Sequence, residues 1–326
     1  MNLSDVSTLK DEMRHAFATS SAFLDGVMKV LPIDLSGFGF AFGARLTPQE
    51  GVYRFAIRVP SRQAWFRLLR PAVKRALRSA RNELDVQVIG PVRFSTADAL
   101  PLAHVNPSLR IGARVRHEGG GGGTLGFFAE KDGRLGIVSC NHVLARLDRG
   151  VDGDRIIGPS DVELALDDRY PKLTDAAVPV KLADCAFAAF VNGDVPAIPG
   201  ALEGAERLRQ TPVLPTKELP VRKIGSATGV TRGKVVVRDL DGVALPIGGS
   251  ATALFNDVIE IESGNAQLRF SNAGDSGSVV YTDNLHPVGL LFADTAIGGK
   301  FKNGLSFANR FEHVTGKRGL GVELVV

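Results

Sequence analysis

The pattern of apolar and polar positions divides the chain near residue 104. Before that point, residues 5–31 and 62–85 carry apolar side chains at roughly helical spacing, the second stretch with a break or kink at Pro71. Apolar runs typical of strands occupy residues 37–46, 52–59 and 85–94. We therefore expect a small α/β module over residues 1–104, with its elements in the order α-β-β-α-β.

The remainder of the chain has a different pattern of apolar and polar residues. From Ile111 onward, short apolar runs alternate with Gly, Asp and Pro turns, and helical periodicity is scarce before the C-terminus. This spacing is typical of β-sandwiches and β-barrels and predicts a mainly β domain over residues 105–326. Five consecutive glycines at 119–123 lack the following Lys-Ser/Thr of a phosphate-binding loop, so we interpret them as a strand connection.

Composition narrows the class of protein only slightly. With 326 residues, 44% of them hydrophobic and 23% charged, the chain is long enough for two or three core-bearing modules. The net charge of +4 is modest and does not by itself indicate nucleic acid. Arginines and lysines gather in residues 62–85, where we expect a solvated helix face. The alternative is a surface for an acidic protein partner or for nucleic acid, and we do not expect nucleic acid.

The N-terminus and the cysteines predict a cytoplasmic location. Asp5, Lys10 and Asp11 interrupt any apolar core that a signal peptide would need. No later segment approaches the roughly 18–20 apolar residues of a membrane helix, so we expect no membrane contact. Cys140 and Cys185 lie in apolar runs, and we expect both to be buried, reduced thiols.

The stretch with the clearest chemical content is residues 270–281, FSNAGDSGSVVY. Gly274 and Gly277 flank Asp275 and Ser276, and glycine permits positive φ and close backbone approach. Ser276 would then lie on a tight loop whose backbone N–H groups face whatever its hydroxyl attacks. The alternative interpretation is a polar turn before a strand.

A nucleophilic serine needs a base within hydrogen-bonding reach and an acid that orients the base. His142 is the preferred base among six histidines, because it follows the strand-like run LGIVS, where it is held rigidly at the edge of a cleft. A satisfied core histidine is the alternative. Asp175 and Asp184 both precede small and apolar residues, and we prefer Asp184 because it opens the longer run DCAFAAFV.

Three motifs in this order, SCNHVL, DCAFA and NAGDSGSVVY, resemble those of the chymotrypsin/trypsin-like serine peptidases. GTLGFF, SCNHVLA, VRKIGSATGVTRGKV and GLLFAD resemble more narrowly the intracellular branch that includes bacterial members and plant Nal1-like proteins. The resemblance covers roughly residues 108–315. It implies two six-stranded antiparallel β-barrels with the site between them. It also implies Ser276 as nucleophile, His142 as general base and then acid, and Asp184 as the orienting acid.

The resemblance carries further expectations about the cleft. The N–H groups of Gly274 and Ser276 would form the oxyanion hole. Asp275 needs a partner other than a cleaved N-terminus, or else is controlled by rearrangement of the oxyanion loop. Phe270 falls at the base of the primary specificity pocket and is not acidic, so a preference for Lys or Arg is not expected. The substrate backbone would pair by strand addition with the edge formed by Leu291, Phe292 and Ala293.

Together these features predict a cytoplasmic serine endopeptidase that acts on protein or peptide substrates without a metal or cofactor. Its N-terminal module would regulate the enzyme or recruit a regulatory protein. One alternative is a catalytically silent pseudopeptidase that uses the cleft to bind peptides. A second alternative is an effector or nucleic-acid binder that acts through the basic helix.

Overall fold

The computed structural model describes residues 1–25, 40–68, 71–78, 80, 82–95, 109–159, 163–170, 180–191, 202, 206–248 and 251–326. Strands predominate among these residues. The helices are α1 (Leu3–Asp25), α2 (Arg62–Leu68), α3 (Pro71–Ala76), α4 (Asn141–Leu144) and α5 (Phe311–Thr315). No helix in the described part of the chain is both long and apolar enough to cross a membrane.

The first β unit follows the N-terminal module. Its strands are β5 (Arg114–His117), β6 (Gly122–Thr124), β7 (Phe127–Lys131), β8 (Arg134–Ser139), β9 (Arg155–Ile157), β10 (Leu164–Tyr170), β12 (Cys185–Phe190) and the C-terminal β21 (Glu323–Leu324). They form one sheet in the order β21-β7-β8-β12-β10-β9-β5-β6. This unit is a half-barrel, because no described pairing joins its two ends. Strand β6 begins within the glycine run.

The second β unit is a closed barrel. Its six strands are β13 (Leu219–Gly225), β14 (Gly229–Asp241), β17 (Val258–Ser263), β18 (Val279–Tyr281), β19 (Pro287–Asp294) and β20 (Leu305–Arg310). They are hydrogen-bonded in the order β13-β18-β19-β20-β17-β14, and the β13–β14 pairing closes the ring. A small sheet of β11 (Val180–Lys181), β15 (Val243–Gly248) and β16 (Ala251–Phe255) lies beside it. The predicted mainly β, chymotrypsin-like fold is thus confirmed, with one closed barrel and one half-barrel.

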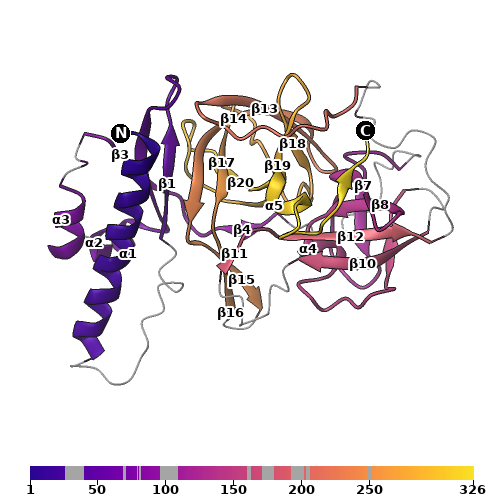
Figure 1. Cartoon of the computed structure of the whole chain (residues 1–326), viewed down its shortest axis with the longest axis horizontal. Coiled ribbons are helices and arrows are strands. Elements are labelled where there is room, and N and C mark those ends of the chain that lie inside the picture. Colours follow the sequence, from indigo (N-terminus) through magenta and orange to yellow (C-terminus); the bar gives the residue numbers. More distant parts are fainter. Residues whose placement is uncertain are drawn as a thin grey trace.

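The N-terminal module continues the sheet of the closed barrel (Figure 1). Its strands are β1 (Ala41–Leu46), β2 (Tyr53–Val59), β3 (Leu84–Val88) and β4 (Arg93–Phe94). Strand β14 is 13 residues long and pairs with β17 on one side and with β1 on the other. The sheet then extends through β2 to β3, a parallel pair that α2 and α3 connect, as parallel neighbours require a crossover.

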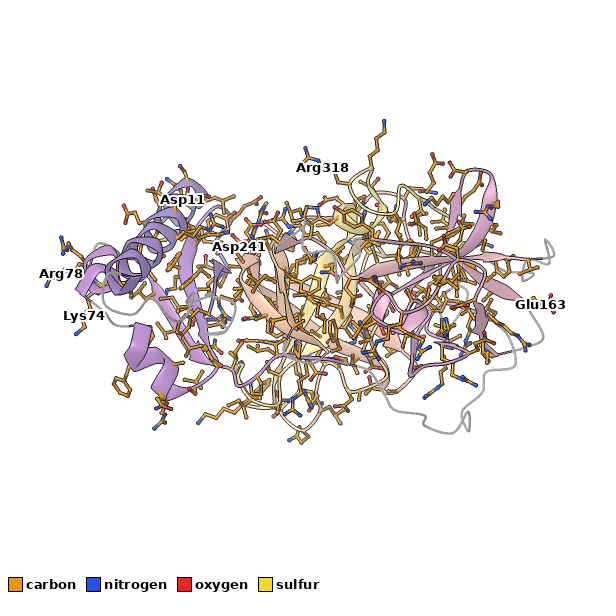
Figure 2. All side chains as sticks on the ribbon, turned by 90° about the horizontal axis from the view of Figure 1, so that it is seen from below. Asp11, Lys74, Arg78, Glu163, Asp241 and Arg318 are labelled. Carbon is orange, nitrogen blue, oxygen red and sulfur yellow. The ribbon has the colours of Figure 1, made fainter. Side chains whose placement is uncertain are left out.

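Helix α1 and the shared sheet enclose a common core. Val6 and Met13 of α1 belong to the same buried cluster as Phe55 of β2 and Val235 and Ile261 of the barrel. Polar contacts follow the same boundary. Lys10 and Arg14 of α1 both form ion pairs with Asp241 at the end of β14, which lies between the helix and the barrel (Figure 2). The predicted domain boundary near residue 104 therefore separates two parts that share a sheet and a core.

A fully buried ion pair joins the module to the barrel. The Arg58 Nε and Nη2 atoms donate to the two carboxylate oxygens of Glu260 at 2.6 and 2.8 Å, and Nη2 also reaches Asp85 Oδ2 at 2.8 Å. Burial alone would lower the pKa of the Arg58 guanidinium, but the two carboxylates outweigh it and the pKa is raised. The charge on Arg58 is therefore retained inside the protein.

We predict that Arg58→Leu destabilises the whole chain by about 3–5 kcal/mol, because it leaves the Glu260 carboxylate buried without its cation. The double variant Arg58→Leu/Glu260→Leu should recover much of this loss, since it removes both charges. Urea denaturation measures both effects. As a control, Lys234→Leu breaks the half-exposed pair with Glu218 and should cost about 0–1 kcal/mol. Equal effects of Arg58→Leu and Lys234→Leu would contradict the assigned role of the buried pair.

Candidate active site

His142 and Asp184 meet between the half-barrel and the closed barrel. Strand β8 ends at Ser139, and His142 lies in the first turn of α4, which follows at once. Asp184 immediately precedes β12, which pairs with β8. The His142 Nδ1 atom is hydrogen-bonded to Asp184 Oδ2, and the His142 backbone N–H donates to Oδ1 at 3.2 Å. Asp184, preferred over Asp175 from sequence, is therefore the aspartate at His142, while Asp175 lies outside the described residues.

The Asp184 carboxylate fixes the imidazole, and the barrel fixes Asp184. Its backbone N–H donates to Asn309 Oδ1 of β20 at 2.9 Å, and the Asn309 side chain is fully buried. A carboxylate at Nδ1 favours the tautomer with its proton on that atom, which leaves Nε2 as a proton acceptor. Nε2 is buried, and no described residue donates to it. Sequence analysis did not identify Asn309.

Ser276 lies in a turn built around the buried side chain of Asp275. Oδ1 accepts hydrogen bonds from the N–H groups of Ala227 and Thr228, both at 3.1 Å. Oδ2 accepts from Thr228 Oγ1 at 2.7 Å and from the Asn272 N–H at 3.0 Å. Lys223 Nζ, from β13, lies 3.1 Å from Oδ2, and both side chains of this ion pair are fully buried. Lys223 is thus the partner that Asp275 needed.

The backbone of this turn is fixed from the other side as well. The Gly274 carbonyl accepts from Thr124 Oγ1 at 2.8 Å and from Ser226 Oγ at 2.9 Å, which fixes the peptide plane between Gly274 and Asp275. Gly274 and Gly277 have φ values of +101° and +91°. A Cβ on Gly277 would lie 2.0 Å from Ser139 Oγ, so both conformation and space require glycine there.

The two N–H groups predicted for an oxyanion hole converge on one carbonyl of the same chain. The Ser95 oxygen accepts hydrogen bonds from Gly274 N at 2.6 Å and from Ser276 N at 3.4 Å. The Ser95 N–H donates to the Phe292 carbonyl at 3.2 Å. Strand β4 pairs antiparallel with β19, Phe94 opposite Ala293. The edge predicted to bind a substrate backbone is therefore paired with residues of the N-terminal module (Figure 1).

The side chains of this segment also contact the site. The Phe94 ring lies over the His142 ring, with 4.5 Å between centroids and an interplanar angle of 40°. Ser95 Oγ donates to Asp294 Oδ2 at 2.7 Å, and Asp294 Oδ1 accepts from Arg269 Nη2 at 3.1 Å. Burial raises the pKa of the Asp294 carboxyl, although the Ser95 and Arg269 hydrogen bonds oppose that rise. The sequence argument did not identify this contact of Asp294.

The other predicted substrate-binding residues contribute in different ways. The side chains of Leu291, Phe292 and Ala293 are fully buried, so β19 presents its backbone to the cleft. Phe270 is buried in the core cluster that the barrel shares with the N-terminal module. None of the described contacts joins Phe270 to Ser95, and its place in a specificity pocket stays a prediction.

The Ser276 hydroxyl is covered. Its side chain is fully buried, and Oγ donates to the Phe292 carbonyl at 3.2 Å. Consecutive residues of one segment thus contact both candidate residues, Phe94 at His142 and Ser95 at Ser276. The peptide segment closes the site over the nucleophile candidate.

Cys140, His142 and Asp184 also offer three potential metal ligands within 4.8 Å of one another. A thiol must lose its proton to bind a metal, but burial raises the pKa of Cys140 well above its ordinary value. Its Sγ atom instead donates to the Leu291 carbonyl at 3.2 Å. Cys140 and Cys185 are both buried free cysteines, as expected. The three groups therefore suit a protonated thiol beside a His–Asp pair better than a metal centre.

Comparison with solved structures finds distant likenesses. Thermobifida fusca Protease A is 15% identical, with a TM-score of 0.46 over 67% of this chain and 98% of the other. Nocardiopsis protease (NAPase) is 17% identical, with a TM-score of 0.49 over 67% and 98%. Cellulomonas bogoriensis chymotrypsin is 16% identical, with a TM-score of 0.44 over 66% and 97%. No family model and no curated protein matches the chain.

We predict that Lys223→Met destabilises the chain by about 3–5 kcal/mol, because it leaves the Asp275 carboxylate buried without a cation. In a chain that also carries Ser95→Trp, so that residue 95 no longer occupies the site, Lys223→Met should lose labelling of Ser276 by a fluorophosphonate probe, since the Gly274 and Ser276 N–H groups lose their fixed orientation. Lys234→Met, at the half-exposed pair with Glu218, is the matched control and should change neither property much. Unchanged labelling of Lys223→Met in that background would refute this role.

The same pair predicts a pH dependence. Burial lowers the pKa of the Lys223 ammonium below its ordinary value, and the attraction of Asp275 only partly opposes this. As the pH rises through that lowered pKa, Lys223 loses its charge and Asp275 its cation, so the labelling rate of Ser276 in the Ser95→Trp background should fall. Lys223→Arg keeps its charge to higher pH. Its labelling rate, measured over the same pH series, should therefore persist further into the alkaline range.

Proposed function

We propose that this protein is a serine endopeptidase in which Ser276 is the nucleophile, His142 the general base and then acid, and Asp184 the residue that orients His142. The observation that carries the proposal is the docking of a peptide carbonyl, that of Ser95, on the N–H groups of Gly274 and Ser276. A peptide bond held there has its carbonyl carbon next to the Ser276 side chain and its oxygen where negative charge develops during acyl transfer.

The reaction follows from the contacts of these groups. The Ser276 hydroxyl turns from the Phe292 carbonyl to His142 Nε2 by rotation about its Cα–Cβ bond, and attacks the carbonyl carbon as Nε2 takes its proton. Asp184 stabilises the imidazolium that forms. The amine leaves with the proton from His142, and water then hydrolyses the ester. Each N–H donor to the oxyanion contributes about 2.7–4 kcal/mol of transition-state stabilisation.

The substrate is a protein or peptide that adds to β19 as an extended strand. The N–H of its P1 residue donates to the Phe292 carbonyl, and the two residues before it pair with Ala293 and Asp294, as Ser95, Phe94 and Arg93 do. The Asp294 carboxylate near the P1 side chain favours a small residue with a hydroxyl group. This reaction needs no metal or cofactor.

The N-terminal module is the proposed regulatory part, and the proposed location is the cytoplasm. Lys74 and Arg78 project from the side of the module away from the barrels (Figure 2), where an acidic protein partner would meet them. Because the module shares its sheet with the barrel and continues into β4, a partner bound to it has a direct structural connection to the cleft.

One observation favours a second candidate, a peptide-binding pseudopeptidase. Ser276 Oγ donates to the Phe292 carbonyl instead of to His142, which is an unreactive arrangement. A fluorophosphonate probe separates the two functions, because only an activated serine reacts with it. Labelling of the wild-type chain at Ser276 supports the enzyme, and its absence in a chain with an open cleft supports the binder.

We predict that Asp184→Asn lowers peptidase turnover by about 10⁴-fold, because the imidazole loses the carboxylate that fixes its tautomer. Ser276→Ala should fold normally and lose both turnover and probe labelling. Asp175→Asn is the matched control and should have a much smaller effect. Turnover on a fluorogenic peptide measures all three variants, and a larger loss in Asp175→Asn than in Asp184→Asn would reverse the assignment of the acid.

A further inference from the structure

We propose that the chain cleaves itself, and that the bond cut is the peptide bond on the carboxyl side of Ser95. This proposal rests on the proposed peptidase function and names the first substrate of that site. The hydrolysis would occur within one molecule, because the segment that ends at Ser95 already lies in the site of its own chain.

The backbone of this segment is bound in the manner of a substrate. The Ser95 carbonyl takes both oxyanion-hole hydrogen bonds, which makes Ser95 the residue whose carbonyl carbon Ser276 would attack. The Ser95 N–H donates to Phe292, and Phe94 and Arg93 pair antiparallel with Ala293 and Asp294. A strand that merely covered the cleft would not need its carbonyl on both N–H groups beside the nucleophile.

The side chains fit the same interpretation. Ser95 is almost fully buried, and its hydroxyl donates to the Asp294 carboxylate, which the Arg269 guanidinium holds in place. Phe94 packs on the face of the His142 ring. Two successive side chains thus have their own contacts in the cleft. A bulky side chain in place of Ser95 would collide with the Asp294 carboxylate.

The preceding residues hold the segment in this position. The Ile89 N–H donates to the Val59 carbonyl at 2.9 Å, and Ile89 is buried. The Gly299 N–H of the barrel donates to Gln87 Oε1 at 3.1 Å. Because the chain is fixed from β3 onward, docking of Ser95 is an intramolecular event that costs little entropy.

The chemistry needs only water as a co-reactant. Ser276 Oγ forms an ester with the Ser95 carbonyl carbon, the C–N bond to Thr96 breaks, and the new Thr96 amine takes the proton that His142 received from Ser276. Water then hydrolyses the ester, which leaves a carboxylate at Ser95 and restores the Ser276 hydroxyl. The masses of fragments 1–95 and 96–326 therefore sum to that of the intact chain plus one water.

The two fragments should remain together after cleavage. Strand β1 pairs with β14, and the Arg58–Glu260 pair and the shared core hold residues 1–95 to the barrel independently of the cut bond. Native mass spectrometry should therefore show one particle. Denaturing mass spectrometry should show two chains, the second beginning with Thr96.

The experiment is a time course of intact mass on purified full-length protein, with four variants. The wild type should convert to the two fragments at a rate that does not depend on protein concentration, and Ser276→Ala should remain one chain. Ser95→Ala, which loses the hydrogen bond to Asp294, should be cut about ten- to a hundredfold more slowly. Ser95→Trp should not be cut, whereas the control Ser7→Trp, on the exposed face of α1, should be cut like the wild type.

Fluorophosphonate labelling of Ser95→Trp separates this proposal from the proposed function, because that variant cannot fill its own cleft. If Ser95→Trp is labelled at Ser276 while the wild type stays intact, self-cleavage is overturned and the peptidase stands. If Ser95→Trp is not labelled and the wild type stays intact, both proposals fail. Cleavage of Ser276→Ala by added wild type, as fast as the wild type cuts itself, would overturn the intramolecular route.

Discussion

The candidate site depends on the buried carboxylate of Asp275. An ionised carboxylate in the protein interior requires a cation and several hydrogen bonds, and Lys223, Thr228 and the surrounding backbone supply them. Meeting this requirement bends residues 272–278 into a single shape, in which the N–H groups of Gly274 and Ser276 point the same way. A Cβ on Gly225 would lie 2.3 Å from Asp275 Oδ1, so glycine there allows β13 to bring Lys223 close.

The N-terminal module is coupled to this turn through one continuous sheet. Strand β14 pairs with β17 of the barrel on one side and with β1 of the module on the other. The ion pair between Arg58 of β2 and Glu260 of β17 adds a second link between the module and the barrel. The chain then runs from β3 to β4, which pairs with β19, the strand whose Phe292 carbonyl accepts a hydrogen bond from Ser276. A module without any of the three proposed catalytic residues thus supplies the peptide that fills the cleft.

The local features on which the sequence predictions rested are present in the structure. The strand before His142, the apolar run after Asp184 and the glycines around Ser276 each lie within a few residues of the group they position. The sequence did not reveal that Lys223 pairs with Asp275 or that Asn309 contacts Asp184. It also did not reveal the contact between Ser95 and Asp294, which are 199 residues apart. Strand β4 has only two residues, Arg93 and Phe94, which is too short for an alternating apolar pattern to predict its pairing with β19. The half-barrel likewise depends on long-range pairing.

The Ser276 hydroxyl and His142 Nε2 differ in whether they have a hydrogen-bond partner. In this position Oγ donates to the Phe292 carbonyl, which also accepts from the Ser95 N–H, while the buried His142 Nε2 has no donor among the described residues. A buried polar atom without a partner costs about 1–3 kcal/mol. The proposed mechanism requires rotation of the hydroxyl to Nε2, which would give that atom a donor while the Phe292 carbonyl keeps its bond from Ser95. The hydrogen bonds around the Ser95 carbonyl therefore allow the Ser276 hydroxyl to change partners without leaving the Phe292 carbonyl unpaired.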